Sequence, residues 1–227
     1  MHPPILLFDI NGVITTAAPK TDLDSYGIAI KKVFGLEASA YDIEYQGMTS
    51  KGIFITLLQG KVSRKKIIAN IDRLFRERFE YYIENLTPSE LSPLPGIKEL
   101  LRKLHGRKYV LGALSGVQRT IAEYQLKFLS VLDFFAIGSY GDKYENRIDL
   151  FYDAISKAEN VLGRRVDKRH VYYFDDSIKG LRAGKKVGVK TVAVATGSHS
   201  LDDLMKVGPD FALEDLTDTD LVLNLIK

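Results

Sequence analysis

Short apolar runs that alternate with helical patterns constrain the fold of this chain more than any other feature. Four nearly continuous apolar runs occur, at 6–8, 109–114, 171–174 and 189–194. Such runs are typical of strands buried on both faces of a parallel sheet. Helical patterns over 97–104, 120–128, 150–158, 181–187 and 220–226 follow or separate them, with two shorter strands predicted at 134–138 and 211–213. This alternation predicts an α/β fold with a doubly wound parallel sheet.

Composition excludes several classes of function. The 227 residues are 45% hydrophobic, enough for one large domain or one domain with an insert. With 32 basic and 29 acidic residues the net charge is +3, which predicts no nucleic-acid partner. The absence of cysteine excludes disulfides, thiolate catalysis and cysteine metal sites. Neither a signal-peptide pattern nor an apolar run of membrane-spanning length is found, so we expect a cytoplasmic protein without a membrane partner. Oligomeric state stays open.

A long segment after the first strand has only helical periodicity. Apolar faces recur at helical spacing over 26–34, 53–58 and 67–83, and Ser63 is the expected cap of the third helix. The sequence from Ser92 to Gly96 (SPLPG) then marks a return to the alternating pattern. We therefore predict an all-helical cap over 16–91, inserted into a core of 1–15 and 92–227. Such an insert would cover the ends of the strands like a lid.

Polar side chains follow three of the predicted strands. Asp9 and Asn11 follow the first, Ser115 ends the second, and Asp175 and Asp176 follow a later one. Because ligands bind outside the carboxyl ends of parallel strands, these residues form a candidate site. Asp9, Ser115 or the Asn11-Gly12 pair could each simply cap a helix or make a turn. Two adjacent carboxylates at the end of a buried strand are harder to explain without a cation.

The predicted site favours a metal-assisted reaction of an anionic substrate. Three converging carboxylates repel one another unless a cation neutralises them, and Mg²⁺ suits a set of oxygen ligands. Ser115 and a basic side chain, Lys143 or Arg147, would hold the anionic group of a small phosphorylated metabolite. Asp9 is the candidate nucleophile, because a carboxylate can accept a phosphoryl group that water later removes.

Four motifs in this order resemble the haloacid dehalogenase (HAD) superfamily across nearly the whole chain. Asp9-Ile10-Asn11-Gly12-Val13 resembles its D-x-D-G-T/V motif, and the strand ending at Ser115 resembles its second. A basic residue follows, and then Asp175-Asp176-Ser177 with Gly180 resembles E-D-S-x-x-G. The resemblance implies a HAD-like Rossmannoid core with the helical type of cap. It also implies Mg²⁺ held by Asp9, Asn11, Asp175 and Asp176, and an aspartyl-phosphate on Asp9.

A closer likeness is to the phosphoglycolate phosphatase-like branch. The matching segments are Gly47-Met48-Thr49-Ser50, Leu94-Pro95-Gly96-Ile97, 139–150 and 193–204. This likeness implies that Arg147, ahead of Lys143, binds the phosphoryl oxygens together with Ser115 and Gly116. An arginine can grip phosphate with two donors. It also implies that Thr49 reaches the substrate from the cap, and it makes phosphoglycolate the expected substrate.

Asn11 departs from the family pattern. An aspartate is expected there as general acid and base, and an amide cannot exchange a proton in that way. The backbone carbonyl implied as a metal ligand is unaffected by the change. Metal and phosphate binding are therefore expected to persist with impaired turnover. The alternatives are a degenerate or trapped phosphatase that binds without turnover and, lower in rank, a phosphosugar mutase or a dehalogenase.

The predicted site depends on a single distance. Asp9 and Asp176 must both reach one ion, so a separation above roughly 10 Å would rule the site out.

Overall fold

A computed structural model describes residues 3–16 and 20–226. Its centre is a sheet of six strands in the order β3-β2-β1-β4-β5-β6, and every neighbouring pair is parallel. The strands are β1 (Ile5–Phe8), β2 (Val110–Ser115), β3 (Ile137–Tyr140), β4 (Val171–Asp175), β5 (Lys190–Val194) and β6 (Phe211–Leu213). The predicted α/β class with a parallel sheet is confirmed.

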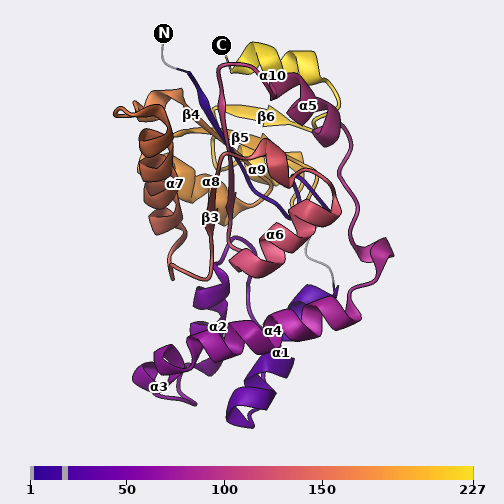
Figure 1. The fold of residues 1–227 in the computed structure, drawn as a ribbon, viewed down its shortest axis with the longest axis vertical. Coiled ribbons are helices and arrows are strands. Elements are labelled where there is room, and N and C mark those ends of the chain that lie inside the picture. The colour runs from indigo at the N-terminus through magenta and orange to yellow at the C-terminus, as the bar shows by residue number, and fades with distance from the viewer. Residues whose placement is uncertain (1–2, 17–19, 227) are drawn as a thin grey trace.

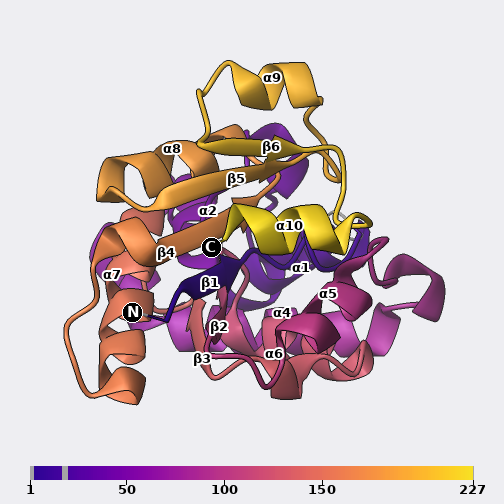
Figure 2. The ribbon, with the colours of Figure 1, turned by 90° about the horizontal axis from the view of Figure 1, so that it is seen from above.

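Helices cover both faces of the sheet, as Figure 2 shows from above. On one face the core includes residues of α5 (Ile97–Leu104), α6 (Arg119–Phe128) and α10 (Thr219–Leu225). On the other it includes residues of α7 (Arg147–Leu162) and α8 (Ile178–Val187). Strands β1, β2 and β4 supply side chains to both cores, which explains why their sequences are continuously apolar. A short helix, α9 (Leu201–Met205), packs beside β5 and β6.

Four further helices lie together beyond one end of the sheet, at the bottom of Figure 1. They are α1 (Lys20–Phe34), α2 (Ser50–Leu58), α3 (Arg64–Ala69) and α4 (Ile71–Asn85). They share a separate hydrophobic cluster that includes Tyr26, Phe54 and Leu74. Single 3-10 turns occur at Ala40–Asp42, Pro88–Glu90, Leu132–Phe134 and Lys168–His170. We call α1–α4 the cap helices. The predicted domain limits at 15/16 and 91/92 stay a prediction.

Two of the predicted elements differ in detail. The single helix expected over 67–83 is two helices, because Asn70 (φ −113°, ψ 10°) ends α3 and begins α4. The apolar face continues across this break, so periodicity alone does not reveal it. The strand expected at 134–138 begins at Ile137, since Phe134 belongs to a 3-10 turn. Helix α9 was not predicted, because its five residues are too short for a periodic signal.

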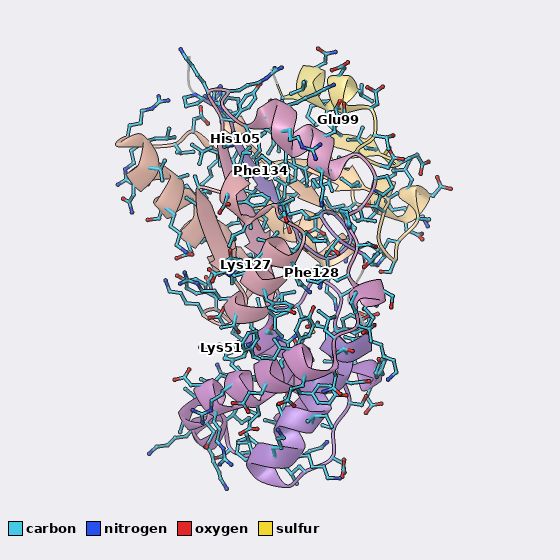
Figure 3. All side chains as sticks on the ribbon, turned by 45° about the vertical axis from the view of Figure 1, so that its right-hand side comes forward. Lys51, Glu99, His105, Lys127, Phe128 and Phe134 are labelled. Atoms are coloured by element: carbon cyan, nitrogen blue, oxygen red, sulfur yellow. The ribbon has the colours of Figure 1, made fainter. Side chains whose placement is uncertain are left out.

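The two chain crossings between the cap helices and the sheet lie side by side. Leu94 donates a backbone hydrogen bond to Ile14, and Thr16 donates one to Ser92. At the start of α2, the backbone amide of Ser50 donates to Gly116 at 2.7 Å, and that of Lys51 donates to Gly141 at 2.8 Å. Lys51 marks this junction in Figure 3. The cap helices are thus hydrogen-bonded to the loops that follow β2 and β3.

Within the described residues, the model contains no helix with both the length and the apolar character needed to cross a bilayer. The cytoplasmic location and the absence of nucleic-acid and membrane partners stay predictions.

Candidate active site

The order of the strands brings the candidate residues together. Strand β1 lies between β2 and β4, so Asp9, Ser115 and Asp175 sit at neighbouring carboxyl ends of the sheet. The amide of Asp9 continues the pairing beyond β1 by donating to the carbonyl of Phe174 at 3.0 Å. The chain winds in opposite directions on either side of β1 and β4. A crevice at such a switch point is where ligands bind in open α/β sheets.

Three carboxylates meet at this point. Asp9, Asp175 and Asp176 each have an oxygen atom, and these atoms lie within 4.8 Å of one another. All three side chains are buried. The distance between Asp9 and Asp176 is therefore well inside the limit that the sequence-based hypothesis set. A divalent ion fits this donor set, because buried carboxylates this close together stay ionised only with a positive charge between or beside them.

Arg147, the first residue of α7, supplies part of that charge. Its buried guanidinium donates through Nη2 to Oδ2 of Asp9 at 2.6 Å and to Oδ2 of Asp175 at 2.7 Å. The same nitrogen also contacts the hydroxyl of Tyr173. One guanidinium against three carboxylates leaves two formal negative charges without a cation in the cluster. This imbalance matches the charge of one divalent ion.

The protonation equilibria of the cluster reflect the same imbalance. Burial raises the pKa of Asp9, although Arg147 opposes the shift. Burial, followed by repulsion from Asp175 and Asp9, raises the pKa of Asp176 well above its usual range. Burial alone would lower the pKa of Arg147, but Asp9, Tyr173 and Asp175 raise it, so this side chain stays charged. A cation near Asp9 and Asp176 would favour their ionised forms.

The two adjacent aspartates have different surroundings. Asp175 accepts hydrogen bonds on both oxygens, from the amide of Ser177 on Oδ1 and from Arg147 and Tyr173 on Oδ2. Asp176 instead lines the cavity described below. Gly12 and Gly197 leave room for the Asp176 carboxylate, since a Cβ atom on either glycine would overlap it. Gly12 also has a φ of +86°, which disfavours other residues.

Asn11 contributes an oxygen that has no partner. Its Oδ1 atom is buried and accepts no hydrogen bond from the described residues. The residue lines the same cavity as Asp9 and Asp176. A buried acceptor without a donor is uncommon and costs free energy unless a ligand satisfies it. This atom is therefore a second observation that favours a bound cation or a hydrogen-bond donor here.

These residues form one wall of a cavity of about 120 Å³. The wall from the sheet includes Asp9, Asn11, Ser115, Gly116, Val117, Arg147, Asp176, Ser177 and Ser198. The opposite wall comes from residues between 22 and 53 and includes Asp22, Leu23, Tyr26, Tyr45, Gln46, Gly47, Met48 and Ile53. Ser115 also hydrogen-bonds the carboxylate of Asp9. The cavity has room for a small ligand only.

The structure does not bring Lys143 or Thr49 to this cavity. Lys143 extends from the loop after β3 and forms an exposed ion pair with Asp153 at 3.1 Å. Thr49 is buried as the N-cap of α2, where its hydroxyl accepts from Gly52 and donates to the carbonyl of Glu145 at 2.7 Å. Both had been expected to bind substrate. The charge of Lys143 is instead paired with Asp153, and the hydroxyl of Thr49 is hydrogen-bonded to Glu145.

Sequence reasoning missed two features of the site. Tyr173 lies two residues before Asp175 on β4, so its side chain points to the same side of the strand, and that spacing could have identified it. Asp22 and Arg78 form a buried ion pair at 2.5 Å beside the cavity. No local sequence pattern predicts this pair, because its two residues are 56 positions apart along the chain.

Comparisons with known proteins agree with this architecture. The family model described as haloacid dehalogenase-like hydrolase matches residues 7–194. A pyrophosphatase PpaX from Halalkalibacterium halodurans is 26% identical over 180 residues, which cover 73% of this chain and 82% of that protein.

Solved structures with the same fold include a hydrolase from Pseudomonas syringae (TM-score 0.72, 20% identity, 98% of this chain and 99% of that one). Another is described as a predicted phosphoglycolate phosphatase from Haemophilus somnus 129PT (TM-score 0.71, 17% identity, 100% and 99%). The family model spans most of the chain, from β1 to the end of β5. This protein therefore belongs to the haloacid dehalogenase-like hydrolases.

Proposed function

We propose that this protein hydrolyses a small phosphomonoester with Mg²⁺, through a phosphoryl group carried transiently by Asp9. The observation that supports this most is the convergence of Asp9, Asp176 and Arg147 on one small cavity. Such a site offers a carboxylate nucleophile, a guanidinium, and carboxylates that could hold a metal ion. Phosphoryl transfer needs a nucleophile and positive charge beside the transferred oxygens. The resemblance to the phosphoglycolate phosphatase-like branch makes phosphoglycolate the reference substrate for this proposal.

The residues present fit the expected metal. Asp9, the carbonyl of Asn11 and Asp176 would hold it, and the unpartnered Oδ1 of Asn11 lies on the same wall. When bound, Mg²⁺ supplies charge neutralisation for the phosphoryl oxygens. We assign Asp175 a different role from the one expected, because both of its oxygens are already hydrogen-bonded. It orients Arg147 and so acts as a positioning residue.

The chain's own groups account for phosphate binding. Ser115 and Gly116 line the cavity beside Asp9, and the serine hydroxyl and the glycine amide are the donors that we assign to phosphoryl oxygens. The Nε of Arg147 is buried and has no partner among the described residues, so one guanidinium donor is still unsatisfied beside the cavity that Arg147 lines. Nη2 meanwhile orients Asp9 and opposes the rise in its pKa that burial causes. An ionised carboxylate is the form that attacks phosphorus.

Asn11 sets the speed of the reaction. An aspartate in this position could protonate the leaving oxygen and then activate water, and an amide can do neither. Loss of such help typically costs about 10²–10⁴-fold in rate. The loss is smallest for leaving groups that depart without protonation. We therefore propose slow turnover of alkyl phosphates and faster turnover of aryl phosphates.

The test is a p-nitrophenyl phosphate assay with Mg²⁺ on the wild type and on Asn11→Asp, Asn160→Asp and Asp9→Asn/Asn11→Asp variants. We expect Asn11→Asp to raise kcat by about 10²-fold with this aryl substrate, the low end of the range for general acid and base help. The exposed Asn160→Asp control should leave kcat unchanged. Removing Asp9 should abolish the gain. Residual activity in the double variant would exclude Asp9 as the nucleophile.

A binding protein without turnover is the second candidate, and Asn11 is the observation that favours it. In that case the wild type binds orthophosphate with Mg²⁺ but hydrolyses no phosphomonoester, whereas Asn11→Asp does. Measurable wild-type hydrolysis above the Asp9→Asn background would decide against it.

A further inference from the structure

The cap wall of the cavity carries one charged side chain, and it is negative. Among the described residues that line the cavity, this wall contributes Asp22 and otherwise uncharged residues. Of the lining residues in 3–16 and 20–226, Arg147 is the one cation, and Asp9 and Asp175 already engage it on the opposite wall. Within the part of the chain that the structure describes, a substrate group that reaches the cap wall therefore meets no free cation.

The charge that balances Asp22 lies behind the wall. Arg78 on α4 donates through Nη2 to Oδ1 of Asp22 at 2.5 Å and through Nη1 to Gln118 at 2.8 Å. Its guanidinium carbon lies 4.1 Å from the centre of the Tyr26 ring, whose residue lines the cavity. Arg78 itself is fully buried and does not line the cavity. Its charge is thus held by Asp22 and screened from a ligand.

Both parts of the molecule fix Asp22 in this position. Arg78 connects Asp22 on α1 to Gln118, the N-cap residue of α6, which packs on the sheet. Gln118 in turn donates to the carbonyl of Phe75 at 3.0 Å and to the hydroxyl of Thr120 at 2.6 Å. A network held at both ends cannot reorganise freely to expose Arg78 to an incoming anion.

We propose that Asp22 determines which leaving group this site accepts: one that carries a hydroxyl or amine donor and no second negative charge. This inference rests on the proposed function, since it concerns the half of the cavity opposite Asp9. A donor would pair with the Asp22 carboxylate in a charge-assisted hydrogen bond. A carboxylate or second phosphate would instead be buried against a like charge, which is unfavourable where water is excluded. Phosphoglycolate is then a poor ligand, and a hydroxyalkyl phosphate is a good one.

Two phosphonates of equal length test this inference without hydrolysis. 3-Hydroxypropylphosphonate and 3-phosphonopropionate differ only in the terminal group, a hydroxyl or a carboxylate. Isothermal titration calorimetry with Mg²⁺ would measure both dissociation constants, with orthophosphate as the reference ligand. We expect the wild type to bind the hydroxyl compound at least about 10-fold more tightly, as one charge-assisted hydrogen bond allows.

Two variants show whether Asp22 is responsible. Asp22→Asn removes the negative charge and leaves that of Arg78 uncompensated, so we expect the preference to fall at least about 10-fold or to reverse. Asp24→Asn, on the same helix, removes a carboxylate that pairs with exposed Lys20, and the preference should persist. Partial unfolding of Asp22→Asn would weaken the apparent binding of both phosphonates by the same factor, so the ratio of their dissociation constants still reports the preference.

The outcomes separate this inference from the proposed function. Orthophosphate that fails to bind to the wild type overturns both. Orthophosphate binding with equal or tighter binding of 3-phosphonopropionate overturns the leaving-group inference alone. A preference that Asp22→Asn leaves unchanged shows that another group sets the selectivity, and it likewise overturns the role of Asp22.

Discussion

The hydroxyl of Tyr173 helps to hold the guanidinium of Arg147 in its place at the site. Its oxygen contacts both Oδ2 of Asp175 and Nη2 of Arg147, and its ring packs edge-on against Phe151 with centroids 4.7 Å apart. Burial is the largest cause of a pKa raised well above that of ordinary tyrosine, so the hydroxyl stays protonated. It can then donate to Asp175 while accepting from Arg147, which fixes the guanidinium in front of Asp9.

A Tyr173→Phe variant tests this role. The ring and its packing remain, so we expect the free energy of unfolding to fall by only about 1–2 kcal/mol. Arg147 loses one of three oxygen partners, and orthophosphate affinity should fall several-fold. Urea unfolding would measure the change in stability, and isothermal titration calorimetry would measure the affinity for orthophosphate. Tyr172→Phe is the matched control, because its hydroxyl pairs with Lys190 away from the cavity. Equal phosphate affinity in both variants would contradict the role.

At the level of the residue, the sequence predicted which side chains follow the strands but not what each one contacts. Asp9, Ser115 and Asp176 could be predicted because a carboxyl end of a parallel strand has a fixed place in the fold. The partners of Asp175 and Lys143, which are Arg147 and Asp153, could not be predicted in this way, because such contacts depend on side-chain packing.

At the level of the element, α1 and α4 are joined by a polar contact inside an apolar interface. These helices make the most extensive contact between any two elements in the structure, and Arg78 with Asp22 lies within it. Both side chains are at most 5% exposed. A buried pair adds little stability over an apolar pair of equal size, but removal of one partner leaves an uncompensated charge.

This arrangement predicts unequal effects of single and double substitution. Arg78→Met should lower the free energy of unfolding by about 3–5 kcal/mol, because Asp22 stays buried without its partner. Asp22→Asn/Arg78→Met should recover most of the loss, since no charge then remains in the interface. Urea unfolding at pH 7 measures both. If the double variant is as unstable as the two single variants added together, the two side chains are not coupled in the way described.

The elements themselves differ in how well the sequence predicts them. The predicted strand at 171–174 and helix at 97–104 match β4 and α5 closely, because apolar pattern and turn residues agree there. The break at Asn70 was missed because Ile67, Ile71 and Leu74 keep one apolar face through it. Where a helix ends inside a continuous apolar face, the backbone conformation of the last residue determines where it ends. Hydrophobic periodicity does not indicate such a break.

For the whole molecule, the size of the cavity depends on how closely the cap helices approach the sheet. Two cavity walls come from segments far apart in sequence, so neither part alone encloses a ligand. The approach is set by backbone contacts at the start of α2. Ser50 donates to Gly116 and Lys51 donates to Gly141, while a Cβ atom on Gly141 would overlap the carbonyl of Gly116. A small residue is therefore required at 141 for the parts to meet.

Gly141→Ala should move the start of α2 away from the sheet. The added methyl group meets backbone atoms, which cannot rotate aside, so the cap wall must shift. We expect 3-hydroxypropylphosphonate to bind about 10- to 100-fold more weakly, as misplacement of about 1 Å can cause. A crystal structure of the variant should show the start of α2 displaced from Gly116. Lys51→Ala is the control, because it keeps the backbone amide that donates to Gly141. Unchanged affinity and an unmoved α2 in Gly141→Ala would mean that the close approach of α2 does not control the cavity.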